Sequence, residues 1–186
     1  MAFSSLEEMA ARTAEAVRPT ERLNVKEWSE KYRRLNNPGS YVGPFKTEKA
    51  PYMAEPMETL TSRDHTAMIF AGPARTGKSD VIFNWVGQTA HLDPMDMVII
   101  HMTQSTARDW SQGDLKKFLR DNPSVDARVA PGRQNRNTHD LGFLSGMRLL
   151  IKWPSITELS GKTIARLWLA DYDRMPKDIE SFGIRS

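Results

Sequence analysis

The sequence predicts an α/β fold in which a mostly parallel sheet lies between helices in a three-layer core, preceded by an α-helical N-terminal arm. Short apolar runs bounded by turn residues at 66–72, 96–102 and 164–171 predict buried strands. Helical patterns follow the first two runs, at 78–88 and 105–121. Strands that alternate with helices in this way are typical of parallel sheets with right-handed crossovers.

The composition is that of a globular domain with a short additional segment. The chain has 186 residues, of which 39% are hydrophobic and 26% charged, and its formal net charge is +3. This weak positive charge is compatible with a nucleic-acid partner but does not establish one. The absence of cysteine excludes disulfides and thiolate metal sites. No apolar run approaches the ~20 residues that span a bilayer, so we expect a cytoplasmic protein without membrane contact.

Residues 1–62 are expected to form the helical arm. Apolar residues at helical spacing predict a helix within 1–19 and a second helix within 20–35. The segment 36–51 contains several glycines and prolines and predicts a connector rich in turns. A short helix is expected within 52–62.

Residues 63–186 are expected to form the core domain. The segment 141–154 predicts a hairpin, because a Ser-Gly turn separates two apolar runs. Gly113 is a weak point in the predicted helix 105–121. In an open parallel sheet, ligands bind at the carboxyl ends of the strands. The two strongest motifs of the sequence both follow predicted strands.

The first motif, GPARTGKS, matches the G-x-x-x-x-G-K-[ST] pattern of a phosphate-binding loop, or P-loop, at every fixed position. Its glycines let backbone N–H groups surround phosphate oxygens at the positive end of the next helix. In such a loop Lys78 reaches the β- and γ-phosphates of ATP, and the Ser79 hydroxyl binds Mg²⁺. We therefore predict nucleotide contacts from the loop and the residue after it: Gly72, Pro73, Ala74, Arg75, Thr76, Gly77, Lys78, Ser79 and Asp80.

Arg75 is an unusual residue inside this loop. Its guanidinium could stabilise the charge on a transferred γ-phosphoryl group, as a catalytic arginine supplied in cis. A solvated loop arginine is an equally good interpretation. Three aromatic residues precede the loop, and their rings could stack on a base or pack the arm onto the sheet, with packing preferred for each. They are Tyr41, Phe45 and Tyr52.

The second motif, RLWLADYDRM, has the form of a Walker B strand, whose terminal acid helps to hold Mg²⁺. We predict Asp171 as this metal ligand and Asp173 as the catalytic carboxylate that orients the attacking water. In an extended chain the two side chains project to the same side. If Asp173 is the metal ligand instead, Arg174 stands where the catalytic carboxylate belongs. A strand that ends in solvated acids is the non-functional interpretation.

Other polar residues give weaker signals. Basic side chains between 108 and 136 could meet a phosphate backbone, but the aspartates among them favour a solvated face. The four histidines have no spacing typical of a zinc site.

Four segments occur in a fixed order over a region that runs from about Trp28 to Glu180. They are VKEWSEKYRRL, GSYVGPFKTEKAPYMAEPM, the P-loop with its arginine, and WLADYDRMPKDIE. Together they resemble the large terminase subunits of tailed bacteriophages, most closely the lambda GpA type. The P-loop is specific for the P-loop NTPase superfamily. The N-terminal aromatic region and the loop arginine narrow the resemblance to terminases.

This resemblance implies a P-loop ATPase motor that drives double-stranded DNA into a procapsid in the host cytoplasm. The implied cofactors are ATP and Mg²⁺. The implied partners are double-stranded DNA, the small terminase subunit and the portal protein, and full-length subunits would form a homo-oligomeric ring. Lys78 and Arg75 would act on the phosphates, and Tyr41 and Tyr52 fall in the segment that approaches adenine in the family.

Two features depart from the family pattern. The family ends its Walker B strand with Asp-Glu, whereas the pairs here are Asp171-Tyr172 and Asp173-Arg174. Relatives also continue into further strands, a coupling motif and a nuclease domain. We therefore expect a truncated ATPase portion with no nuclease domain and a sheet that is incomplete towards its C-terminus. The alternatives are a non-catalytic remnant that binds nucleotide or subunits, and another P-loop translocase such as a helicase.

Overall fold

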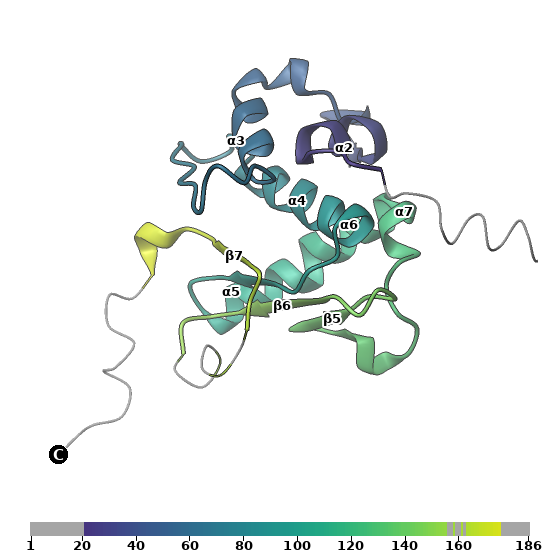
Figure 1. The fold of residues 1–186 in the computed structure, drawn as a ribbon, viewed down its shortest axis with the longest axis vertical. Coiled ribbons are helices and arrows are strands. Elements are labelled where there is room, and N and C mark those ends of the chain that lie inside the picture. Colours follow the sequence, from purple (N-terminus) through teal and green to yellow (C-terminus); the bar gives the residue numbers. More distant parts are fainter. Residues whose placement is uncertain (1–20, 156–157, 159–160, 162, 176–186) are drawn as a thin grey trace, which may run out of the picture.

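The computed structural model describes residues 21–155, 158, 161 and 163–175 (Figure 1), so the helix expected within residues 1–19 lies outside the described residues. The helices are α2 (Val25–Tyr32), α3 (Ala54–Thr59), α4 (Lys78–Leu92), α5 (Gln104–Asp109), α6 (Lys116–Asp121) and α7 (Pro123–Asp126). The strands are β1 (Arg34–Asn37), β2 (Tyr41–Pro44), β3 (Met97–Ile100), β4 (Arg136–Asn137), β5 (Asp140–Gly142), β6 (Arg148–Lys152) and β7 (Arg166–Leu169).

The main sheet confirms the α/β class and has five strands in the order β4-β5-β6-β3-β7. β3 pairs in parallel with both β6 and β7, whereas β4, β5 and β6 pair antiparallel. The sheet is therefore mixed, and the expectation of a mostly parallel sheet is not confirmed. The predicted hairpin 141–154 is present, with Gly146 in the left-handed conformation at its turn (φ +87°).

One predicted strand is absent. Residues 66–72 have no regular secondary structure, and the Ile69 side chain is 93% exposed. β7 ends the sheet among the described residues, and residues 66–72 do not pair with its free edge. β7 is therefore an edge strand and is not buried as expected. Its Leu167 and Leu169 side chains are 49% and 39% exposed.

The expected helices of the core are confirmed. The pattern at 78–88 forms α4, which is longer than predicted and ends at Leu92. The pattern at 105–121 forms α5 and α6, joined by a π-helical segment, Trp110–Leu115. Gly113 lies inside this segment, where the regular α-helical hydrogen bonding is interrupted.

The N-terminal segment forms more regular structure than predicted. A capping box between Asn24 and Glu27 begins α2, the second helix expected from the sequence. The segment 36–51, expected as a connector, contributes to a β1–β2 hairpin. The hairpin turn is closed by a hydrogen bond from the Ser40 N–H to the Asn37 carbonyl (3.0 Å) and includes Gly39 at φ +84°.

The core is built around α4, which lies between the sheet and the N-terminal helices α2 and α3 (Figure 1). Its residues 81–90 are all buried. α2 approaches α4 where Trp28 lies over Gly87, and the Trp28 indole donates a hydrogen bond to His91 Nδ1 (3.1 Å). Trp28 belongs to the same hydrophobic cluster as Ile99 of β3, so the N-terminal segment and the sheet share one core. The domain boundary between residues 62 and 63 stays a prediction.

We expect the free energy of unfolding to decrease as the pH falls from about 6.5 to about 4, partly through His91. Burial lowers the pKa of His91 to about 4 from its ordinary value of 6.5. Between these values the unfolded chain binds a proton that the folded chain excludes, so stability is lost as the pH falls. Chemical denaturation at neutral and acidic pH measures the effect.

The variant His91→Gln keeps an acceptor for the Trp28 indole and is expected to show a weaker pH dependence. His65→Gln removes an exposed histidine and serves as the matched control. If His91→Gln and the unchanged chain lose the same stability over this pH range, His91 is not responsible.

Candidate functional site

The predicted phosphate-binding loop leads directly into α4. Gly77 has a left-handed conformation (φ +78°), and the helix begins at Lys78. The Lys78 ammonium donates hydrogen bonds to the carbonyl oxygens of Gly72 (2.6 Å) and Pro73 (2.9 Å). The Thr76 hydroxyl donates to the same Pro73 carbonyl (2.8 Å). These bonds fold the loop around its lysine at the N-terminal end of a 15-residue helix, where the helix dipole favours an anion.

Two residues of the predicted site have strained backbones. Arg75 (φ +64°) and Asp171 (φ +49°) are the two non-glycine residues with positive φ in the described part of the chain. This conformation costs roughly 1–2 kcal/mol for an ordinary side chain, although aspartate tolerates it better than most. Such strain is concentrated at functional sites. The backbone therefore singles out one residue from each of the two sequence motifs.

A pocket of about 300 Å³ brings the two predicted metal ligands together. Ser79 enters it from the first turn of α4, and Asp171 enters it from the end of β7. Six other lining residues come from α4, from the position after β3, and from α5 with its π-helical segment: Ile82, His101, Thr106, Asp109, Trp110 and Asp114. The rest of the loop 72–78 does not line this pocket. We call it the Ser79–Asp171 pocket.

Asp173 lies differently from Asp171. The chain does not continue in an extended conformation after β7, because residues Tyr172–Arg174 form a 3₁₀ turn that begins after Asp171. The expectation that Asp171 and Asp173 project to the same side of an extended chain is therefore wrong. Asp173 is exposed and does not line the Ser79–Asp171 pocket. Its catalytic role stays a prediction.

His101 is a residue of this pocket that the sequence patterns did not single out. It directly follows β3, so the parallel pairing of β3 with β7 places it beside the segment that carries Asp171. Its ring lies 5.1 Å from the Trp110 ring, and its Nε2 atom is buried without a hydrogen-bond partner among the described residues. Burial lowers the pKa of His101 to about 4, and the Asp171 carboxylate opposes this shift. The histidine is therefore neutral near pH 7. Its position at the end of a strand was the available sequence signal.

Arg33 fixes the first turn of α4 from outside the loop. Its guanidinium is buried, donates to Asn84 Oδ1 (2.8 Å) and forms an ion pair with Asp80 (3.0 Å). It also lies over the rings of Phe83 and Phe118. Burial lowers the pKa of Arg33 to about 10, so the side chain remains charged at neutral pH. The Asp80 carboxylate, predicted to contact nucleotide, is thus engaged by Arg33.

The aromatic residues before the loop have different environments. Phe45 is buried in the core, as the packing interpretation expects. Met53 lies against Gly77, because a Cβ atom on that glycine would be 2.9 Å from the Met53 sulfur. The neighbouring Tyr52 belongs to the same 3₁₀ turn as Met53, and its side chain is 56% exposed. The Lys49 ammonium lies over the Tyr41 ring, 3.3 Å from the centre of that ring. The Tyr41 hydroxyl donates a hydrogen bond to the Pro44 carbonyl.

The residues of the Ser79–Asp171 pocket fit Mg²⁺ as a cation that a nucleotide brings with it. Among the described residues, no group of three or more His, Cys, Asp or Glu side chains could hold a metal ion. Mg²⁺ is usually bound by one or two protein oxygens, several waters and substrate phosphates. The Ser79 hydroxyl at the start of α4 and the Asp171 carboxylate after β7 meet this requirement. Within the described part of the chain, no helix is both long and apolar enough to cross a membrane.

The chain was compared with known protein families and curated proteins. No curated protein matches it. A family model described as "Phage terminase large subunit gpA, ATPase domain" matches residues 39–184. The matched region contains the phosphate-binding loop, the Ser79–Asp171 pocket and the strained residues Arg75 and Asp171. Because the match covers more than half of the sequence, the chain belongs to the family of phage terminase large subunit ATPase domains.

Proposed function

We propose that this ATPase domain hydrolyses ATP in a Mg²⁺-dependent reaction at the N-terminal end of α4. The observation that carries the proposal is the Ser79–Asp171 pocket, because it joins residues from two distant motifs at the start of the helix that follows the phosphate-binding loop. Its oxygen ligands suit Mg²⁺, and the loop and helix dipole suit phosphate.

Each proposed role follows from the position of a side chain. The phosphates would replace the carbonyl oxygens of Gly72 and Pro73 as partners of the Lys78 ammonium. Ser79 and Asp171 would hold Mg²⁺, which neutralises phosphate charge when bound. Arg75, exposed in the strained loop, would approach the γ-phosphoryl group and stabilise its developing charge. Tyr52 and Tyr41 are proposed for the adenine side.

The biological partners follow from the family. Terminase large subunits act on DNA, so we propose that turnover powers the movement of double-stranded DNA into a procapsid in the host cytoplasm. The small terminase subunit and the portal protein are the proposed protein partners. Assembly of the subunits into a homo-oligomeric ring is proposed as the active form.

The test compares Asp171→Asn with Asp173→Asn in an ATP hydrolysis assay of the purified chain. Asp171→Asn is expected to lower turnover about 100-fold or more and to raise the Mg²⁺ concentration that turnover requires, because it removes a charged metal ligand. If Asp173 orients water without touching the metal, Asp173→Asn lowers turnover without changing the Mg²⁺ requirement. The opposite pattern would reverse the two roles.

Nucleotide binding provides the control for this test. ATP binding by all three chains with no turnover in the unchanged chain would contradict catalysis and support a non-catalytic nucleotide-binding remnant. Equal turnover in Asp171→Asn and the unchanged chain would exclude the Ser79–Asp171 pocket as the metal site.

A further inference from the structure

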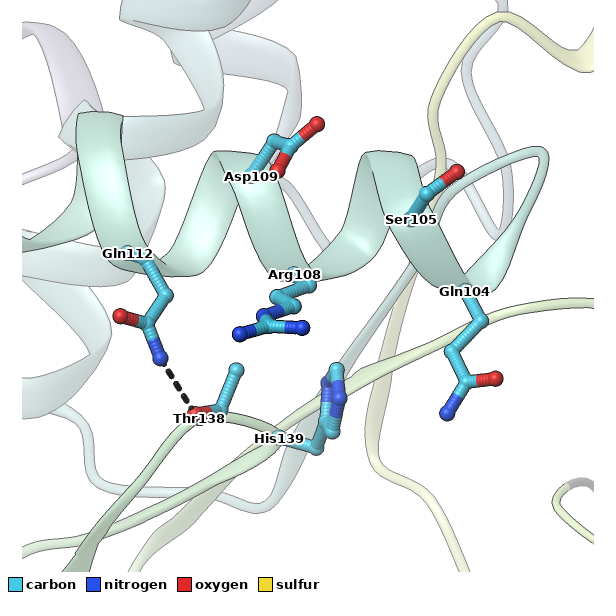
Figure 2. Close-up of a pocket in the computed structure, with 7 residues that line it drawn as sticks. All are labelled: Gln104, Ser105, Arg108, Asp109, Gln112, Thr138 and His139. Atoms are coloured by element: carbon cyan, nitrogen blue, oxygen red, sulfur yellow. Dashed lines mark hydrogen bonds between the residues drawn. The ribbon is translucent and has the colours of Figure 1, made fainter.

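A second and larger pocket, of about 700 Å³, lies on another side of α5 (Figure 2). Gln104, Arg108 and Gln112 are four residues apart, so they share one face of the helical segment. Thr138 and His139, between β4 and β5, form the opposite wall. The Gln112 amide closes the pocket at one end by a hydrogen bond to the Thr138 hydroxyl (2.7 Å). We call this cavity the Arg108 pocket.

The Arg108 guanidinium is the main charge in this pocket. In Figure 2 it points from the helix towards Thr138 and His139, whereas the neighbouring Asp109 points to the other side of the helix. No hydrogen bond or ion pair joins the Arg108 side chain to another residue in the described ranges. Within that part of the chain, no residue occupies the five donor N–H groups of this guanidinium. An unpaired arginine that faces a cavity favours an anionic ligand.

His139 adds a polar wall without adding charge. Its ring packs edge-on against Trp153, with 5.2 Å between ring centres. Its Nδ1 atom is buried and lacks a hydrogen-bond partner among the described residues. Burial, followed by the nearby Lys152 ammonium, lowers the pKa of His139 from its ordinary value. The charged residues of the lining are therefore Arg108 and Asp109, of which only the Arg108 side chain points towards Thr138 and His139.

We propose that the Arg108 pocket binds a backbone phosphodiester of the DNA substrate. A guanidinium, two side-chain amides and a hydroxyl match the donors that position a protein on nucleic-acid phosphates without reading sequence. The pocket is open to solvent and larger than a single phosphate group, so a phosphate that is part of a longer chain can enter it. The choice of DNA over other phosphate compounds rests on the proposed function.

The position of α5 relates this site to the nucleotide site. Asp109, the residue after Arg108, lines both the Arg108 pocket and the Ser79–Asp171 pocket. One short helix therefore borders the proposed DNA contact and the proposed metal site. A DNA phosphate bound by Arg108 would lie directly across this helix from the nucleotide.

The experiment measures the binding of the purified chain to a short labelled duplex of random sequence over a range of salt concentrations. Each phosphate contact contributes about 0.9 to the slope of log K against log salt. Arg108→Ala is expected to reduce this slope by about one and to weaken binding about fivefold near 0.15 M salt. Arg108→Lys keeps the charge and is expected to retain most of the slope.

The matched control is Arg22→Ala, which removes the same charge from an exposed position before α2. Its salt slope is expected to stay close to that of the unchanged chain. An unchanged slope in Arg108→Ala, or the same loss in Arg22→Ala, would overturn the proposal. A loss of ATP binding instead of DNA binding in Arg108→Ala would overturn it too. Because DNA binding is measured without turnover, the result is independent of whether the chain hydrolyses ATP.

Discussion

A Lys78→Ala chain is expected to hydrolyse ATP about 100- to 1,000-fold more slowly than the unchanged chain, which is the scale for removing one preorganised group that stabilises transition-state charge. In the structure the Lys78 ammonium is held by two carbonyls of its own loop, at 2.6 and 2.9 Å. In the proposed complex with nucleotide, the ammonium would contact the β- and γ-phosphates instead. Steady-state hydrolysis in the presence of Mg²⁺ measures the loss.

Two further variants separate charge from geometry in this prediction. Lys78→Arg keeps the positive charge but replaces a compact ammonium by a planar fork, so it is also expected to be strongly impaired. Lys46→Ala removes an exposed lysine elsewhere and is expected to retain turnover. Turnover in Lys78→Ala close to that of the unchanged chain would show that hydrolysis does not use this loop.

Gly87→Ala is expected to destabilise the fold by about 3 kcal/mol, although alanine normally stabilises a helix by about 1 kcal/mol relative to glycine. A Cβ atom at Gly87 would lie 2.0 Å from Cη2 of Trp28, inside the van der Waals contact distance. Trp28 is fully buried and its indole is tied to His91, so the ring cannot move aside freely. Chemical denaturation of the two chains measures the difference in the free energy of unfolding.

The matched control for this substitution is Gly113→Ala. Nothing lies within 4 Å of a Cβ atom at Gly113, so its replacement is expected to be neutral or mildly stabilising. The double variant Trp28→Phe/Gly87→Ala tests the mechanism, because the shorter phenylalanine does not reach the position of the distal indole ring. If Gly87→Ala costs the same free energy in both backgrounds, contact with Trp28 is not the cause.

The loop that we propose to bind phosphate could be singled out from the sequence because its pattern is local. Eight consecutive residues specify the turn, the lysine and the hydroxyl, and the helix that follows begins at Lys78 as predicted. Asp171 could also be proposed as a site residue from the sequence, because an acid at the end of an apolar run is a local pattern. The strain at Arg75 and Asp171 was not predictable, because a φ angle depends on the contacts around a residue.

Strand formation was predicted less well than helix formation. Helices α4, α5 and α6 close their hydrogen bonds within the segment, so periodicity and caps were sufficient. The run 66–72 is as apolar as a strand but pairs with no other strand. The segment 36–51 was expected to be an irregular connector and yet contributes to a hairpin. Pairing decides such segments, and pairing is a property of two segments together.

The sequence by itself determined the α/β class, the loop that suits phosphate and the resemblance to phage terminase large subunits, because each is encoded by neighbouring residues. Only the tertiary structure decided which distant residues meet. It placed Ser79 beside Asp171, His101 in the same pocket, Arg33 against Asp80, and Arg108 opposite Thr138 and His139. These contacts join residues from separate elements, whose relative positions are fixed by the packing of α4 against the sheet and the N-terminal helices rather than by spacing along the chain.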